Sequence, residues 1–351
     1  MAYTTINKST DYFNTVSYSG TGSAQSITGV GFRPDWLWIK HREDVSNHKL
    51  HDVIRGSTKV LGSNETSAEA TVAQGVTSFD SDGFSLGTDA SVNGTGAAGI
   101  VAWNWLAGGS QGSSNTDGSI NTTYTSVNTT AGFSIVSYTG NATSGATIGH
   151  GLGAVPKMII TKNRDEGGGN QDWCVYHVSV GANKGMFLNL SNSPDTNAKY
   201  FNDTTPTSSV FTVGNNLGTN GSGDNMIAYC FAEKTGYSKI GSYTGNGNAD
   251  GTFVYTGFKP AWIMGKRYDN TNNWYIFDSV RDPHNLTQRY IRADTNSAEI
   301  NNSSKAIDIV SNGFKIKNSD GEFNASGGTY LYMAFAEAPL VGSNNIPATA
   351  R

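Results

Sequence analysis

One unit recurs three times along the chain, and this internal repeat limits the possible folds more than any other feature. Each copy has a Ser-Tyr-Ser/Thr-Gly segment, a largely apolar run from a proline to a lysine, and two closing runs around a Gly-rich turn. These landmarks lie at 17–20, 34–40 and 84–105, at 137–140, 156–162 and 211–231, and at 242–245, 260–266 and 314–335. The shared order predicts three units, residues 1–107, 130–234 and 235–351, the last with a C-terminal tail.

The dipeptides at the turns indicate strands rather than helices. Asp-Gly or Asn-Gly, which tolerates the positive φ of a tight hairpin, stands at 82–83, 93–94, 220–221 and 312–313. No stretch of about a dozen residues keeps helical apolar spacing without a Gly or Asn interruption. We therefore expect an all-β fold of three tandem antiparallel β-sandwich units of the jelly-roll kind, each burying its own core. The aromatic residues expected to fill these interiors are Trp38, Trp105, Phe231, Trp262 and Phe335.

The segment between the first two units, residues 108–129, is rich in Gly, Ser, Asn and Thr. This composition is typical of a flexible linker. Only residues 234–236 separate the second unit from the third, so we expect those two units to abut rigidly.

Charge and hydropathy exclude two classes of partner. The chain has 24 basic and 28 acidic residues, a net charge of −4, and so lacks the basic surface that nucleic acid binding requires. Apolar runs such as 36–39 are far shorter than a membrane helix, so no membrane span is expected. Residues 1–8 do not resemble an export signal, which favours assembly in a cytoplasm, and Cys174 and Cys230 are accordingly expected as buried thiols.

Apparent catalytic motifs are better explained as turns and strand positions when the copies are compared. Ser85 lies in a Gly-x-Ser-x-Gly sequence, but it aligns with Thr212 and Lys315 and so occupies an outward position of a strand. Residues 94–99 match Gly-x-Gly-x-x-Gly, but a strand follows where nucleotide binding needs a helix. The six histidines show no zinc-ligand spacing and are expected in exposed loops. We expect no enzyme activity, no catalytic residue, no metal site and no cofactor.

A basic cluster after each proline run is the first candidate binding site. It comprises Lys40 and Arg42, Lys162 and Arg164, and Lys266 and Arg267, each followed by an aspartate. One interpretation is a salt-bridged strand end, and the other is a site for an anion or a sugar acid. A second recurring pair, Asp52 with Arg55 and Asp278 with Arg281, becomes His177 and Val180 in the middle copy, which would have lost any site built on it.

Trp173 and Trp274 form the second candidate site. They stand in equivalent places of two copies, each directly after an Asp or Asn. An exposed ring of this kind can stack on the apolar face of a sugar while the short polar neighbour binds its hydroxyls. The alternative is that both rings are packed between sheets.

Several segments of the second and third units resemble a repeated, largely uncharacterised domain in virion proteins of marine tailed bacteriophages. The resemblance covers residues 133–340 and is carried by 206–214, 227–233, 243–247, 260–262 and 332–339. The first unit departs from it at 102–106, where Ala-Trp-Asn-Trp-Leu replaces the Tyr-Cys-Phe-Ala-Glu ending, and this suggests a unit that diverged to dock on the particle.

The resemblance implies a non-enzymatic structural protein of the virion, of the tail-fibre or appendage type, exposed on the particle surface. Its expected partners are other virion proteins, further copies of the chain in a homotrimer by analogy with phage fibres, and glycan on the host surface, since tandem units suit multivalent attachment. Trp173, Trp274, Lys162, Arg164, Lys266 and Arg267 are the candidate ligand-binding residues. The alternatives are a capsid decoration or cement protein and an enzyme that degrades surface polysaccharide.

Overall fold

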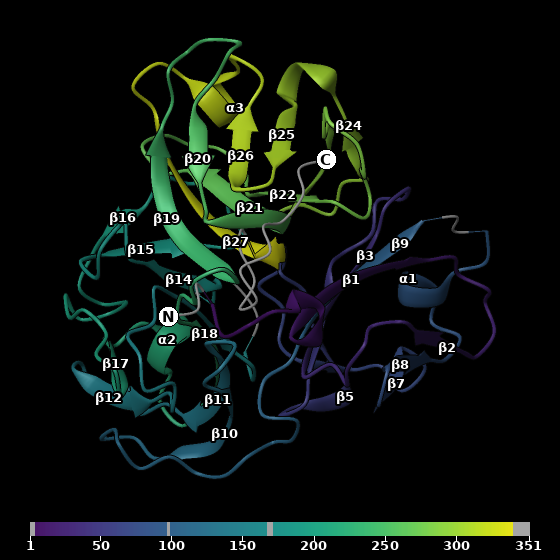
Figure 1. Cartoon of the computed structure of the whole chain (residues 1–351). Helices are drawn as coiled ribbons and strands as arrows, with labels where there is room; N and C mark the ends of the chain where they lie inside the picture. The colour runs from purple at the N-terminus through teal and green to yellow at the C-terminus, as the bar shows by residue number, and fades with distance from the viewer. Residues whose placement is uncertain (1–3, 97–98, 167–170, 340–351) are drawn as a thin grey trace.

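The computed structural model describes residues 4–96, 99–166 and 171–339 and consists almost wholly of antiparallel β-strands (Figure 1). The helical elements are short: α1 (Ala90–Asn93), α2 (Leu217–Asn220), α3 (Gly321–Asn324) and the 3-10 turns η1 (Ser9–Asp11) and η2 (Ser303–Lys305). No helix in these ranges has the length and hydrophobicity needed to cross a membrane. The expected all-β sandwich fold is confirmed. The C-terminal tail expected after the third unit lies outside the described residues from 340 onward.

Three large sheets share one order of six strands, in which the first and last strands of each unit pair, and sheet 2 has one further strand at its edge. Sheet 1 has the order β1 (Phe13–Tyr18), β9 (Ile100–Trp105), β3 (Trp36–His41), β4 (Lys49–Asp52), β5 (Gly56–Leu61) and β6 (Ala70–Thr71). Sheet 2 has β10 (Thr122–Asn128), β11 (Phe133–Thr139), β18 (Asn225–Phe231), β13 (Met158–Asn163), β14 (Cys174–His177), β15 (Lys184–Phe187) and β16 (Asp195–Thr196). Sheet 3 has β19 (Ser238–Thr244), β27 (Thr329–Pro339), β21 (Phe258–Arg267), β22 (Tyr275–Asp278), β23 (Arg289–Arg292) and β24 (Ile300–Asn301).

A small sheet accompanies each large one. Small sheet 1 contains β2 (Gln25–Thr28), β8 (Gly83–Leu86) and β7 (Val76–Asp80), small sheet 2 contains β12 (Ala146–Gly149) and β17 (Val210–Val213), and small sheet 3 contains β20 (Phe253–Tyr255), β26 (Gly313–Ile316) and β25 (Ile307–Val310). Each encloses a separate hydrophobic core with its large sheet. The outward strand position expected for Ser85 is confirmed, and its hydroxyl donates to Asp80 at 2.7 Å.

The tyrosine of the repeated Ser-Tyr-x-Gly segment connects each large sheet to its short helix by a hydrogen bond. The hydroxyls of Tyr18, Tyr138 and Tyr243 donate to carbonyls of α1, α2 and α3 at 2.9, 2.6 and 2.9 Å. A Cβ on the glycine two residues later would lie 2.1 Å from a backbone oxygen at Gly20 and at Gly140, so only glycine permits this close approach. Helix and strand therefore meet in the same way in all three copies.

A fourth core, shared by all three large sheets, occupies the centre of the molecule. In β3, Trp36 and Trp38 face this central core while Leu37 and Ile39 face small sheet 1, as the two-residue period of a strand requires. Trp36 stacks on Tyr229 of sheet 2 with ring centroids 4.6 Å apart, and Phe13 stacks on Phe335 of sheet 3 at 5.2 Å. The five aromatic residues expected inside are all at most 2% exposed. The expectation that each unit buries its own core is therefore incomplete, because the inner sheet faces pack against one another.

Residues 108–129 differ from the flexible linker that their composition predicts. Residues 122–128 form β10, which pairs with β11, and Ile120 forms a bridge to Ile148 at the edge of small sheet 2. Asp35 Oδ2 accepts hydrogen bonds from the backbone of Ala107 and Gly109 at 2.8 and 2.7 Å. Threonine and tyrosine are common in strands, so the threonine content of this segment does not distinguish a strand from a loop.

Candidate functional site

The two candidate tryptophans are buried, which contradicts their proposed role as exposed sugar-binding rings. Trp173 and Trp274 are both 0% exposed. Trp173 Nε1 donates to Gly62 O of the first unit, and Trp274 Nε1 donates to Phe187 O of the second, each at 2.8 Å. Both rings reach across to the neighbouring sheet. The second interpretation, rings packed between sheets, is the correct one.

His48 occupies the position in the first unit that corresponds to Trp173 and Trp274, and it makes the third contact between neighbouring units. Its Nδ1 accepts from Trp38 Nε1 at 2.7 Å, so Nε2 carries the proton and donates to Arg292 O of the third unit at 3.0 Å. The second unit thus contacts the first, the third contacts the second, and the first contacts the third through the same position. The three sheets form a closed cyclic arrangement within one chain.

Lys162 and Lys266 are also buried, and they hold loops of the neighbouring unit rather than a ligand. Lys162 Nζ donates to Thr66 O at 3.0 Å and to Gln171 O at 2.9 Å. Lys266 Nζ donates to Ser191 O at 2.8 Å and to Asn272 O. Burial lowers the pKa of each ammonium to about 8. All four of these hydrogen bonds end on a backbone carbonyl, so the two lysines contribute to cohesion between units.

Arg164 joins the second unit to the first through a bidentate ion pair with Glu69. Its Nε and Nη2 donate to the two oxygens of Glu69 at 2.9 and 3.0 Å. Arg42 makes the same contact with Glu299 of the third unit, at 3.0 and 2.9 Å. The salt-bridged interpretation of these strand ends therefore holds for both arginines, with the partner in another unit.

Arg267 occupies a different place. Counting from the equivalent lysines, Tyr268 rather than Arg267 corresponds to Arg42 and Arg164. Arg267 Nε donates to Asp269 at 2.6 Å, and its Nη1 donates to Gly321 O at 3.1 Å. Of the six candidate residues it alone lines one of the surface pockets described below.

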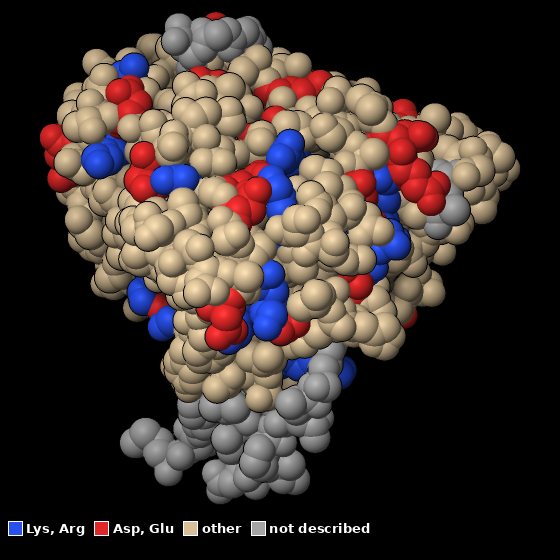
Figure 2. Space-filling model, turned by 90° about the horizontal axis from the view of Figure 1, so that it is seen from above, with Lys and Arg blue, Asp and Glu red and all other residues tan. Residues whose placement is uncertain are grey.

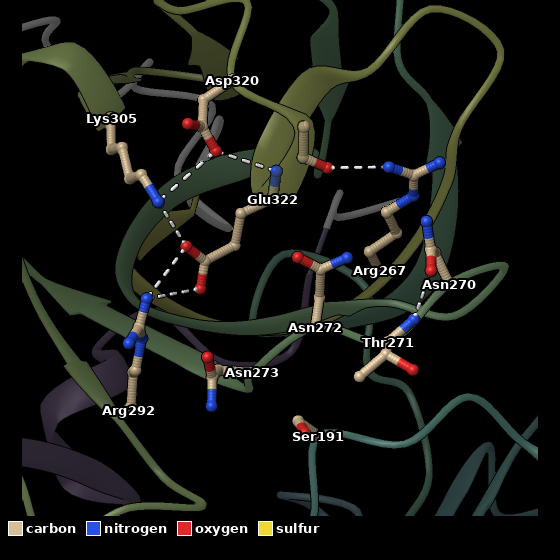
Figure 3. A pocket seen from close by; sticks show the side chains of 11 residues that line it. Ser191, Arg267, Asn270, Thr271, Asn272, Asn273, Arg292, Lys305, Asp320 and Glu322 are labelled. Carbon is tan, nitrogen blue, oxygen red and sulfur yellow. Dashed lines mark hydrogen bonds and ion pairs between the residues drawn. The ribbon is translucent and has the colours of Figure 1, made fainter.

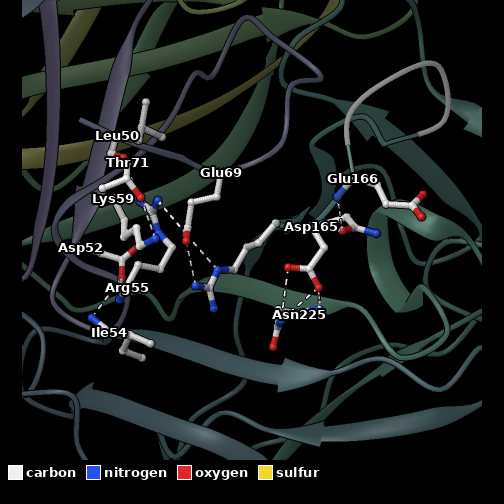
Figure 4. Close-up of polar contacts among 12 residues, drawn as sticks. Leu50, Asp52, Ile54, Arg55, Lys59, Glu69, Thr71, Asp165, Glu166 and Asn225 are labelled. Carbon is white, nitrogen blue, oxygen red and sulfur yellow. Dashed lines mark hydrogen bonds and ion pairs between the residues drawn. The ribbon is translucent and has the colours of Figure 1, made fainter. Parts of the chain in front are cut away.

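The recurring Asp–Arg pairs are buried where units meet. Asp52 binds Arg55, and Asp278 binds Arg281, with all four side chains fully buried. Figure 4 shows Arg55 between Asp52 and Glu69. In the middle copy, His177 Nδ1 accepts from Ser179 N, and Nε2 therefore donates to Tyr332 O at 3.3 Å. These positions stabilise contacts between the sheets in all three copies.

The histidines differ from the exposed loop positions expected for them. His41, His48, His51, His150 and His177 are at most 4% exposed, whereas His284 is exposed. Burial lowers the pKa of His48 and His51 to about 3 and that of His177 to about 4. No group of three metal-ligating side chains occurs in the described ranges. Cys174 and Cys230 are buried free thiols, as expected, and burial raises the pKa of both.

A polar pocket of about 460 Å³ lies at the outer end of sheet 3, beside the second unit (Figure 3). It is lined by the loop of residues 270–273, by Arg267, Arg292 and Lys305, by residues 320–322 at the α3 turn, and by Ser191 of the second unit. Lys305 Nζ lies 2.6 Å from Glu322 Oε2 and 3.4 Å from Asp320 Oδ1. Arg292 Nη2 binds Glu322 at 3.2 Å, while its buried Nε has no partner among the described residues.

Asn272 contributes a half-buried side-chain amide to the pocket. Its backbone N–H donates to Ser191 O at 2.8 Å and its carbonyl accepts from Lys266, which fixes the loop. Its side-chain amide points into the hollow and makes no hydrogen bond to the described residues (Figure 3). An amide offers one acceptor and two donor positions to a ligand.

Sheet 1 has a hollow of about 380 Å³ in the corresponding place, between the loop after β3 and the α1 turn. Its lining includes Val45, Ser46, Ser91 and Thr95. Ser46 corresponds to Asn272, and its N–H likewise donates to a backbone carbonyl of the neighbouring unit, Asn296 O, at 2.9 Å. The hollow of sheet 1 is also lined by His41 and Asp44, whereas the pocket of sheet 3 is lined by five charged side chains, three basic and two acidic.

Sequence reasoning did not single out Asn272, Arg292, Lys305 or Glu322. They are far apart along the chain, and Ser191 comes from another unit. The one available signal is residues 318–321, a turn sequence whose Asp320 accepts from Glu322 N at 2.8 Å and starts α3. Basic and acidic side chains are interspersed on the face seen in Figure 2, in keeping with the small net charge.

The family described as Domain of unknown function (DUF7483) matches residues 8–339. None of the curated proteins and no solved structure matches the chain.

Proposed function

The chain belongs to the DUF7483 family, and we propose that it is a non-enzymatic virion protein of a tailed bacteriophage, of the tail-fibre or appendage type, that contacts host-surface glycan. The phage assignment rests on the resemblance of residues 133–340 to virion proteins. The glycan assignment rests on the pocket of sheet 3, because the candidate aromatic and lysine residues are committed to contacts between units.

The chemistry of the pocket suits a polyhydroxylated ligand. Saccharide hydroxyls are bound by planar polar groups that donate and accept together. The pocket offers the amide of Asn272, the guanidinium of Arg292 and the carboxylate of Glu322 around one hollow. Its lining charges nearly cancel, with Arg267, Arg292 and Lys305 against Asp320 and Glu322, which favours a neutral sugar over a strongly anionic one.

The ion pairs in the pocket favour binding over hydrolysis. A glycosidase needs two carboxyl groups, one of them protonated to act as the acid. Asp320 and Glu322 both lie in ion pairs with Lys305, and Glu322 also binds Arg292. Both carboxylates are thus engaged in ion pairs within the pocket lining.

The homotrimer proposed by analogy with phage fibres would have to form through the outer surfaces. The inner faces of the three large sheets already pack against one another within one chain. The closed arrangement supports a rigid body that presents its pocket in a fixed orientation.

The test is binding of the full chain to an array of immobilised neutral and acidic oligosaccharides. Asn272→Ala is expected to reduce binding of a neutral oligosaccharide at least about tenfold, the loss of one or two hydrogen bonds. The matched control Ser46→Ala, in the equivalent hollow of sheet 1, is expected to leave binding unchanged. Equal loss in both variants, or release of reducing ends from the sugars, would overturn the proposal. Labelling of the capsid lattice rather than the tail by an antibody would favour the decoration role.

A further inference from the structure

The small sheets differ in whether a further segment of the chain covers their edge strand. The outer edge of β12 is covered by the chain itself, through residues 119–120. Ile120 N donates to Thr147 O at 3.0 Å, Ser119 N donates to Thr147 Oγ1 at 2.8 Å, and Thr147 N donates to Ser119 Oγ at 2.9 Å. Ile120 is 8% exposed and joins the core of the second unit. An extended, uncharged segment is therefore the natural cover for this edge.

The corresponding strand of the third unit, β20, has no such cover. It stands at the edge of small sheet 3, and no strand or bridge within residues 4–96, 99–166 and 171–339 lies on its outer side. Val254 faces the core, while Phe253 and Tyr255 point outward and are 46% and 53% exposed. The equivalent outward positions are Ser26 and Thr28 in β2 and Thr147 in β12. Large aromatic side chains at this place are thus particular to the third unit.

The backbone of β20 leaves hydrogen-bonding groups free at this edge. Ile316 N donates to Thr252 O, and Thr256 N donates to Asn312 O, both at 3.0 Å. The alternation of an antiparallel ladder then directs the N–H and C=O groups of Phe253 and Tyr255 away from β26. Exposed edges with unpaired groups of this kind are templates for another strand.

The charges beside β20 are already compensated. Lys315, opposite Phe253, lies 2.5 Å from Asp250, and Lys317 lies 3.8 Å from Asp308. An incoming segment therefore meets an apolar strip without net charge. Aromatic side chains pair well with β-branched ones across neighbouring strands.

We propose that β20 adds an extended, uncharged polypeptide segment of a partner protein as a further strand, with β-branched side chains packed against Phe253 and Tyr255. Backbone hydrogen bonds would hold the segment, and the two aromatic side chains would determine which segments bind. This surface belongs to small sheet 3 and does not use the pocket residues, so the proposal is independent of the glycan site.

The probe is a synthetic peptide of residues 118–124 with capped ends, which contains the segment that covers β12 and no charged side chain, carrying Ser119→Val and Asn121→Val. Binding to the isotope-labelled full chain is followed by the amide signals of β20 in NMR. We expect shifts at Phe253 and Tyr255 and slower hydrogen exchange there. Tyr255→Ala is expected to weaken binding by about fivefold, the worth of one cross-strand pair.

Tyr255→Pro removes the outward N–H and is expected to abolish binding at an unchanged melting temperature, since edge strands tolerate proline. If the proline variant is unstable, Tyr255→Lys gives a second test, because a charge on the apolar strip should also abolish binding of the peptide. Thr28→Pro, in the equivalent strand β2, is the matched control and should bind normally. Shifts at β12 instead of β20, or shifts at Phe253 and Tyr255 with an oligosaccharide but not with the peptide, would overturn the proposal.

Discussion

Trp103 Nε1, in the first unit, donates a hydrogen bond to Asp278 Oδ2, in the third, at 2.9 Å, and both side chains are buried. Tyr229, the equivalent residue of sheet 2, donates through its hydroxyl to Asp52 Oδ2 of the first unit at 2.7 Å. In sheet 3 the same place is taken by Met333, which has no hydrogen to donate. The contact at sheet 3 instead runs from His177 of the second unit to the backbone carbonyl of Tyr332, at 3.3 Å.

Trp103→Phe removes this hydrogen bond while keeping an aromatic ring in the core. We expect a loss of about 1 to 3 kcal/mol in the free energy of unfolding, the cost of leaving a buried acceptor with one partner fewer. Urea denaturation measures it. The matched control is Met333→Leu, which makes no such bond and should cost less than about 1.5 kcal/mol. Equal losses would show that ring packing alone matters at this position.

Asp52→Asn leaves the buried guanidinium of Arg55 without its closest counter-charge. Breaking a buried ion pair typically costs about 3 to 5 kcal/mol, and Glu69 at 3.4 Å from Arg55 places the expected loss at the lower end. Asp269→Asn, at the more exposed pair with Arg267, is the control and should cost less than about 1 kcal/mol. Similar small losses in both variants would contradict the structural role of Asp52.

The repeat, the strands and the interior tryptophans follow from sequence because they depend on local patterns. Trp38 and Trp262 lie on strands whose alternation fixes an inward face. Trp173 could not be placed in this way, because an Asp-Trp step looks the same whether the ring faces solvent or a neighbouring unit. Lys162 is buried although lysine is usually exposed, since carbonyls from another loop surround its ammonium. The pocket combines Ser191 with residues of the third unit, and nothing in their spacing indicates that contact.

Trp274→Ala tests the corrected position of this ring. Because Trp274 is fully buried and bonded to Phe187 O, we expect a loss of about 3 to 5 kcal/mol. Trp274→Phe keeps most of the volume and should lose less, which separates packing from the hydrogen bond. Both are measured by urea denaturation. A wild-type stability for Trp274→Ala would instead indicate an exposed ring.

Lowering the pH should destabilise the fold, because the pKa values of Glu299 and His177 are lower in the folded state than in the unfolded chain. Burial raises the pKa of Glu299, but the hydrogen bond from Arg42 and the charge of Arg281 lower it to about 2. The stabilisation from this carboxylate is full above its ordinary pKa of 4.5 and is lost as the pH falls from there to about 2. His177, neutral in the fold because burial lowers its pKa to about 4, contributes stability that is lost as the pH falls below 6.5.

Urea midpoints between pH 7 and pH 2 measure the contributions of Glu299 and His177. Asp35 acts in the opposite direction, because burial raises its pKa to about 6 and the folded state gains stability as the pH falls from 6 to 3.8. The three histidines with strongly lowered pKa values outnumber it, so we expect a net loss. His177→Gln should flatten the dependence of the urea midpoint on pH between pH 6.5 and 4. An unchanged slope in His177→Gln would contradict the assignment.

The central claim is that the three units share one core and therefore unfold together. Differential scanning calorimetry of the full chain tests it most directly, by comparing the calorimetric enthalpy with the van't Hoff enthalpy. We expect one transition in which the two agree, and Phe335→Ala, in the central core, should lower the temperature of that whole transition. Two or three separate transitions, of which Phe335→Ala moves only one, would contradict the shared core.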